Sequence, residues 1–69
     1  MNGTRLVVAL RRYRSAAGLT QARLADAVGV SRKTINTIEN GVFVPSTILA
    51  LRLARHLGVS VHDLFALPD

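Results

Sequence analysis

The sequence predicts an all-α fold in which five short helices pack around one small core. A chain of 69 residues has room for a single domain. Apolar residues make up 49% of the chain, and they recur at the spacing of three and four residues that marks one face of a helix. Residues that can cap a helix precede these stretches, and glycine follows four of them. The only β-prone stretch, residues 42–44, is too short to matter, so we expect no strand.

The first helix is expected to follow an N-cap at Thr4 and to end at Gly18. Its apolar residues follow the periodicity of one helix face, which predicts that this face turns toward the core. The inward positions are then Leu6, Leu10, Tyr13 and Ala17.

The second and third helices form a pair joined by a short turn. Thr20 is the N-cap candidate of a helix over residues 21–28, which Gly29 ends. Ser31 caps the next helix, which runs to Glu39 or Asn40. Two short helices joined in this way cross at a steep angle and form a helix-turn-helix unit.

The last two helices are also delimited by their caps. Ser46 precedes a fourth helix that ends at Leu57. Ser60 and Asp63 have the spacing of a capping box, which opens a last helix from Val61 to about Phe65.

The charge of the chain is positive and unevenly distributed. Nine Lys and Arg residues stand against four Asp and Glu residues, which gives a net charge of +5. Residues 1–41 hold seven of the basic residues and two of the acidic ones, so the whole excess lies there. Such a field favours a polyanionic partner, nucleic acid before an acidic membrane surface. The alternative is that scattered arginines only keep the protein soluble.

Several function classes lack the residues they need. There is no cysteine, which excludes disulfides, zinc fingers and a thiol nucleophile. His56 and His62 do not have the spacing of metal ligands. No glycine motif for a catalytic serine or a phosphate is present, so we expect neither an enzyme nor a cofactor. No apolar run is long enough for a membrane helix or a signal peptide, which predicts a cytoplasmic protein without a membrane partner.

The third helix has the side chains of a helix that reads DNA. With Ile35 and Ile38 facing the core, the polar residues between and before them point outward. Arg and Lys can read guanine, Asn can read adenine, and the Thr methyl group can contact thymine. The candidate base-reading residues are Arg32, Lys33, Asn36 and Thr37.

A series of short motifs resembles, in order, the phage-repressor-type (xenobiotic-response-element-like) helix-turn-helix family. The motifs are Gly18–Gln21, Leu24–Ala25, Val28–Arg32, Thr34–Asn36, Ile38–Gly41, Pro45–Ser46 and Leu57–Ser60. The resemblance covers about residues 5–67, with the helix-turn-helix unit at about 20–40 and residues 1–4 as an N-terminal arm. It implies a five-helix lambda-repressor-like domain that regulates transcription by binding double-stranded DNA, usually as a homodimer. No small-molecule effector domain is evident.

The resemblance also implies roles for further residues. Arg14 and Glu39 match a structural ion pair between the first and third helices. Residues that match phosphate-contacting or bracing positions are Thr20, Gln21, Arg23, Ser31, Thr34 and Asn40. Arg23 stands where the family commonly has an acidic residue, so it either neutralises a phosphate or is an ordinary surface arginine.

The loop after the third helix departs from the family pattern. Residues 42–44 are Val, Phe and Val, without the basic residues that often add phosphate contacts there. Anchoring on this side is then weak, or it passes to the first helix and the N-terminal arm.

The fourth helix is apolar over about 200° of its circumference, more than one core-facing stripe needs. We expect Ala50, Leu51, Ala54 and Leu57 to face the core. The surplus apolar edge predicts a homodimer contact made by Leu49, Leu53, Phe65 and Leu67, with Phe43 as a further candidate. Alternatively, the last helix covers this edge within one chain. A dimer would present two recognition helices about 34 Å apart to a near-palindromic site.

Rival functions use the same residues differently. The fold could serve as an antitoxin-like or adaptor module that binds other proteins. A binder of acidic membranes would need basic residues beside one apolar helix face, which the first helix only partly provides.

Overall fold

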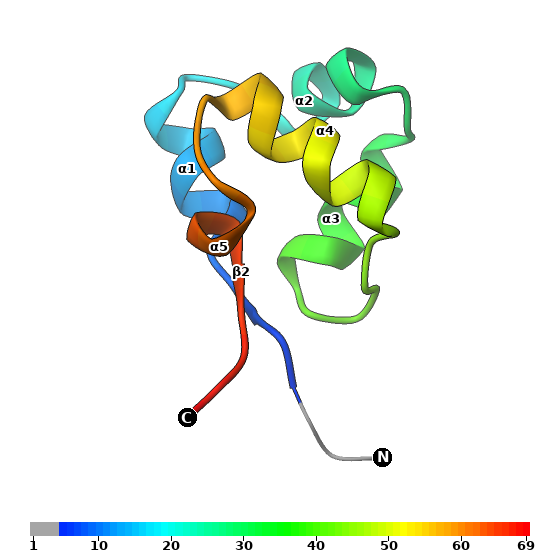
Figure 1. Cartoon of the computed structure of the whole chain (residues 1–69). Coiled ribbons are helices and arrows are strands. Elements are labelled where there is room, and N and C mark those ends of the chain that lie inside the picture. Colours follow the sequence, from blue (N-terminus) through cyan, green and yellow to red (C-terminus); the bar gives the residue numbers. More distant parts are fainter. Residues whose placement is uncertain (1–4) are drawn as a thin grey trace.

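The computed structural model describes residues 5–69, and it contains five helices and a two-stranded ribbon (Figure 1). The helices are α1 (Leu10–Ala16), α2 (Gln21–Val28), α3 (Arg32–Glu39), α4 (Thr47–Leu57) and α5 (Val61–Leu64). The strands are β1 (Val7–Val8) and β2 (Phe65–Ala66). The expected cap Thr4 and the arm of residues 1–4 lie outside the described residues.

Side-chain caps begin four of the helices as the sequence predicts. The hydroxyl oxygens of Thr20, Ser31 and Ser46 each accept a hydrogen bond from the backbone amide three residues further on, at 3.0–3.1 Å. Ser60 and Asp63 form both bonds of a capping box, which satisfies two amides of the first turn of α5. The predicted bounds of α2, α3 and α4 are confirmed.

The prediction that the chain has no strand was wrong. Val7 pairs with Ala66 and Val8 pairs with Phe65 in an antiparallel ribbon, which the Ala9 amide extends by donating to the Leu64 carbonyl at 2.8 Å. The first helix therefore begins at Leu10 and the last ends at Leu64, while Ala17 is exposed. β-branched valines favour a strand when a partner is available, and this partner lies at the other end of the chain.

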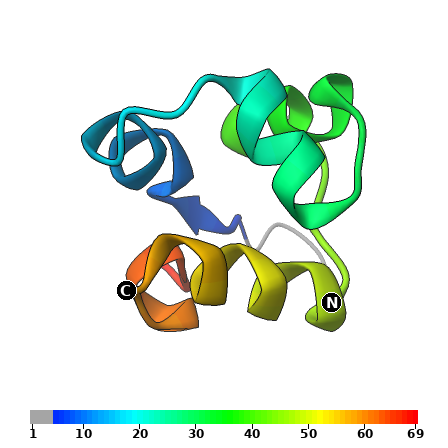
Figure 2. The ribbon, with the colours of Figure 1, turned by 90° about the horizontal axis from the view of Figure 1, so that it is seen from above.

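The core takes a buried apolar residue from every helix. Seen from above (Figure 2), α4 lies along one side of the molecule and the α2–α3 pair along the other. The fully buried large side chains are Leu10, Leu24, Ile35, Ile38, Leu53 and Leu64. No helix within residues 5–69 has the length and hydropathy to cross a bilayer.

The expected orientation of α4 was wrong for three of its leucines, whereas Ala54 is buried as expected. Leu49 and Leu53, expected at a dimer edge, are buried in the core with exposures of 8% and 0%. Leu51, expected in the core, is 55% exposed, and Ile48 is 65% exposed. Because apolar residues surround so much of α4, its own sequence does not specify which of them face inward. Packing against α2 and α5 decides it.

Candidate nucleic-acid interface

A short turn fixes α3 relative to α2. Gly29 ends α2 with a φ of +81°, a conformation that L side chains rarely adopt. The amides of Gly29 and Val30 both donate to the Ala25 carbonyl, at 2.9 and 3.0 Å. Ser31 then caps α3 at once. The turn is therefore held to α2 by two backbone hydrogen bonds and to α3 by the Ser31 cap.

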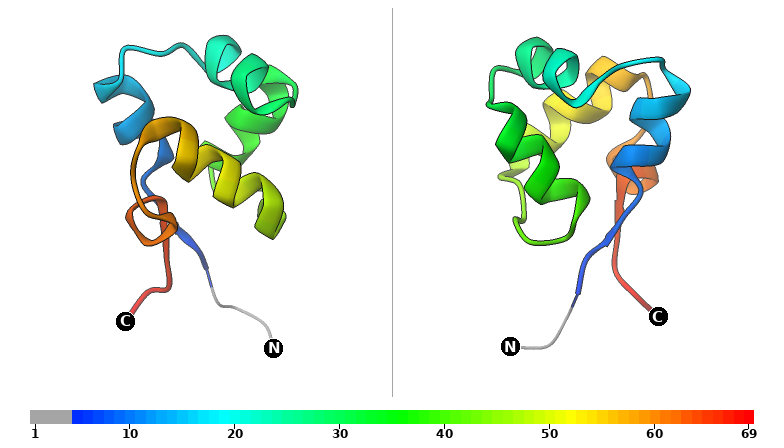
Figure 3. Two further views of the ribbon diagram at one scale, coloured as in Figure 1. Left: turned by 45° about the horizontal axis from the view of Figure 1, so that its top comes forward. Right: turned by 180° about the vertical axis from the view of Figure 1, so that it is seen from behind.

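The outer face of α3 is polar and lies opposite its buried face. Ile35 and Ile38 are fully buried. At about 100° per residue, the direction opposite them passes between Lys33 and Asn40, with Asn36 beside it. Seen from behind (Figure 3, right), α3 lies in front of α4. The exposed side chains of α3 and its C-cap are Arg32, Lys33, Asn36 and Asn40, and Thr37 is half-buried.

Hydrogen bonds along α3 limit what its side chains can offer. The Thr37 hydroxyl donates to the Thr34 carbonyl at 2.9 Å, and the hydroxyls of Thr34 and Ser31 lie 3.0 Å apart. Asn40 Nδ2 donates to the carbonyl and to the Oδ1 of Asn36, at 3.0 and 3.2 Å. Asn36 keeps its own amide hydrogens and one lone pair of Oδ1 free, which is the set that reads adenine.

A buried carboxylate joins α3 to α1 and α2. Glu39 has no exposed side-chain surface and accepts from Arg14 at 2.6 and 3.2 Å. Gln21 Nε2 donates to Glu39 Oε1 at 3.0 Å, and Arg11 Nε lies 3.5 Å from the same oxygen. Arg14 Nη1 also donates to the Leu19 carbonyl. The predicted Arg14–Glu39 ion pair is present, and Gln21 braces α3 through it.

The ion pair keeps both of its members charged. Burial alone would raise the pKa of Glu39, but the hydrogen bonds from Arg14 and Gln21 and the charge of Arg14 outweigh it and lower this pKa. The hydrogen bond to Glu39 raises the pKa of Arg14 despite its burial. The Arg14 side chain is 14% exposed, so a charge left alone here would be largely cut off from water.

The other residues predicted to contact DNA differ in their exposure and in their hydrogen bonds. The hydroxyls of Thr20 and Ser31 act as helix caps, and Thr34 is half-buried beside Ser31. Arg23 is exposed in the first turn of α2 and makes no ion pair within residues 5–69. The Asn40 amide already donates to the Asn36 carbonyl, so Asn40 exposes its side chain rather than its backbone donor.

Two features of the surface escaped the sequence analysis. Arg5 lines a hollow together with Asn40 and Gly41, at the end of α3. The strand alternation of residues 5–8 could have revealed that Arg5 is exposed.

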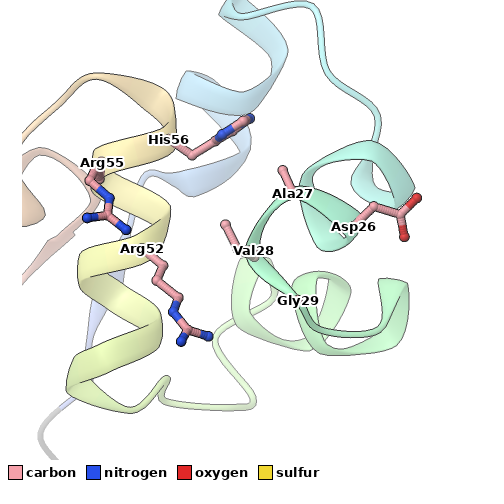
Figure 4. Close-up of a pocket in the computed structure, with 7 residues that line it drawn as sticks. All are labelled: Asp26, Ala27, Val28, Gly29, Arg52, Arg55 and His56. Atoms are coloured by element: carbon pink, nitrogen blue, oxygen red, sulfur yellow. The ribbon is translucent and has the colours of Figure 1, made fainter.

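A second hollow lies between the end of α2 and α4 (Figure 4). The side chains of Arg52, Arg55 and His56 reach it from α4, and the Asp26 carboxylate points away from them. In the described part of the chain, no three His, Cys, Asp or Glu side chains are grouped so that they could hold a metal ion. Neither feature adds a catalytic group.

The remaining surface feature is apolar. We define the apolar end surface as the seven exposed large hydrophobic side chains. They are Val7, Val42, Phe43, Val44, Ile48, Leu51 and Leu67. Two members of this set, Val44 and Leu51, line a groove of about 250 Å³ together with Phe65. Phe65, expected at a dimer contact, is half-buried, whereas Leu67 is exposed.

Comparisons with known proteins agree with this geometry. An uncharacterised HTH-type transcriptional regulator of Methanothermobacter thermautotrophicus is 48% identical over 61 residues, which are 87% of this chain and 88% of that protein. The restriction-modification controller protein C.AhdI of Aeromonas hydrophila is 36% identical, with a TM-score of 0.75 over 81% of this chain and 85% of its own. SinR, a master regulator for biofilm formation solved in complex with DNA, is 30% identical, with a TM-score of 0.71 over 77% of this chain and 86% of its own.

The family assignment rests on nearly all of the residues that the structure describes. Residues 5–67 match the family model described as a helix-turn-helix domain. This chain therefore belongs to the phage-repressor-type helix-turn-helix family of transcriptional regulators.

Proposed function

We propose that α3 enters the major groove of double-stranded DNA and reads a specific sequence there. The observation that carries the proposal is the outer face of α3, where Lys33 and Asn36 stand exposed opposite two buried isoleucines. Arg32 lies at the edge of this face and Thr37 offers its methyl group. The solved complex of the related SinR with DNA supports this use of the fold.

Phosphate contacts supply the affinity that does not depend on sequence. Gln21 and Arg23 lie in the first turn of α2, at the amino end of the helix-turn-helix unit. Arg23 is free of internal ion pairs in the described chain and so can neutralise a phosphate. Thr20, Ser31, Thr34 and Asn40 then serve mainly to hold the two helices that carry these contacts.

The regulator acts as a homodimer through the apolar end surface, in place of the buried Leu49 and Leu53. Each copy carries a net charge of +5, so two copies repel wherever charged faces meet. No charged side chain lines the groove, whose walls include Val44, Ala50, Leu51 and Phe65. Val44 and Leu51 are exposed beside this groove, and exposed apolar surface that gathers in one place on a small protein marks an interaction site. A second copy covers it without opposing like charges.

Selection of bound duplexes from a random pool at fixed salt tests this function. The expected product is a motif with two half-sites related by a near-palindrome, with their centres about one helical turn apart. A motif with a single half-site would contradict the homodimer, but it would still agree with base reading by α3. A pool that shows no enrichment would contradict sequence-specific binding and favour the adaptor alternative.

A further inference from the structure

The carboxyl end of α3 and the loop that follows it carry no positive charge. Residues 40–46 are Asn, Gly, Val, Phe, Val, Pro and Ser. Backbone amides can also hold a phosphate. However, the amides of residues 40–43 already donate to carbonyl oxygens of α3 at 2.9–3.2 Å. A charged contact to a phosphate at this end of α3 therefore has to come from another part of the chain.

Arg5 is placed to supply that cation. A hollow of about 610 Å³ opens between β1 and the end of α3, and both Arg5 and Asn40 line it. Side chains alternate along residues 5–8, which lead into and form β1, so that Arg5 and Val7 are exposed while Leu6 and Val8 are half-buried. Arg5 makes no ion pair with any other described residue, so within residues 5–69 no carboxylate competes for its guanidinium donors.

The carboxylate in the same hollow does not cancel this charge. Glu39 lines the hollow, but its side chain has no exposed surface and is held by Arg14 and Gln21. Arg11, which is 63% exposed, lies next to it with Nε 3.5 Å from Oε1. Of the two charged side chains that line the hollow, Arg5 is therefore the exposed one.

We propose that Arg5 contacts the DNA backbone at the carboxyl end of α3, beside the loop that lacks basic residues. The inference rests on the proposed function, because it requires a duplex against α3. A guanidinium binds phosphate oxygens through paired N–H donors, and such a contact is independent of base sequence. Arg5 thus anchors the end of the recognition helix that its own loop leaves unanchored.

Salt-dependent titrations of the full chain test this role. Wild type and Arg5→Ala are titrated with a selected duplex and with an unrelated duplex of equal length, at about 50 and 200 mM salt. Arg5→Ala is expected to weaken both duplexes by the same factor. The factor by which Arg5→Ala lowers the binding constant should be about 3.5 times larger at the lower salt than at the higher salt for each protomer bound, because one phosphate contact is lost.

Two further variants make the result decisive. Arg55→Ala removes another exposed arginine, which lies in α4 beside the hollow shared with α2, and gives the background effect of one lost charge. Arg5→Lys keeps the charge and should retain most of the salt dependence. If Arg5→Ala matches Arg55→Ala while Lys33→Ala still alters base preference, the inference is overturned and the proposed function stands. If the wild type binds no duplex, both are overturned.

Discussion

Glu39→Gln removes the charge at the centre of the contacts that hold α3 to α1 and α2. The glutamine fills the same space, and its carbonyl oxygen can still accept from Gln21 or Arg14. What it loses is the charge that compensates Arg14, which is only 14% exposed. The variant therefore isolates the ion pair from the packing around it.

The size of the effect follows from burial and from the number of bonds. Removing one partner of a buried pair costs about 3–5 kcal/mol, because it leaves an uncompensated charge. Arg14 keeps its bond to the Leu19 carbonyl and the glutamine keeps one acceptor, so we expect a loss of about 2–3 kcal/mol. A domain of this size has a total stability of roughly 3–10 kcal/mol, so the variant still folds at neutral pH.

Urea unfolding at several pH values measures this loss. Because the pKa of Glu39 is lower in the folded chain than its ordinary value of 4.5, the unfolded chain binds the proton more readily. The stabilisation by Glu39 is therefore complete above that value and is lost as pH falls through the lowered pKa. Wild type should lose stability more steeply than Glu39→Gln on acidification.

A double-mutant cycle separates the pair from its surroundings. Arg14→Met and Glu39→Leu together should destabilise the protein by less than the sum of the two single changes, because the double variant buries no lone charge. The reasoning is refuted if the free energy of unfolding of Glu39→Gln lies within about 0.5 kcal/mol of the wild-type value at neutral pH and has the same acid dependence.

Three further changes probe the reading face, the dimer and the turn. Lys33→Ala should cost about 1–3 kcal/mol at one base pair and little elsewhere, in titrations over single-base variants of the selected site. An equal loss on every sequence would make Lys33 a phosphate contact instead. Leu51→Glu should give a monomer in sedimentation with unchanged helix content, since Leu51 lies in the apolar end surface; an intact dimer would place the interface elsewhere. Gly29→Ala should lose about 1–2 kcal/mol in urea unfolding from its φ of +81° alone, because the added Cβ meets no atom within 4 Å. An unchanged midpoint would show that the turn relaxes.

The features that sequence predicted well depend on neighbours along the chain. Thr20, Ser31 and Ser46 cap helices through amides three residues away, so each cap is visible in a short window. The outer face of α3 follows from the spacing of Ile35 and Ile38 in the same way. The Arg14–Glu39 pair is different, because only the resemblance to a family placed these distant residues together.

The features that sequence missed depend on partners far along the chain. Val7 and Val8 form a strand because Phe65 and Ala66 return to meet them. Leu51 is exposed because α2 and α5 bury Leu49 and Leu53 instead, a choice that the broad apolar surface of α4 leaves open. The hollow that Arg5 shares with Asn40 exists only once the ribbon lies beside the end of α3.

The recognition helix depends on contacts outside itself for its rigidity. An eight-residue helix is marginal in water on its own, so α3 is ordered by the rest of the fold. The Gly29 turn holds its amino end, and Glu39 holds its carboxyl end through Arg14 and Gln21. Loosening either end of α3 lets its exposed side chains take a wider range of positions, and this effect does not depend on the base sequence of the duplex. Variants of Glu39 should therefore weaken binding to all duplexes alike, and this separates a residue that positions α3 from one that reads a base.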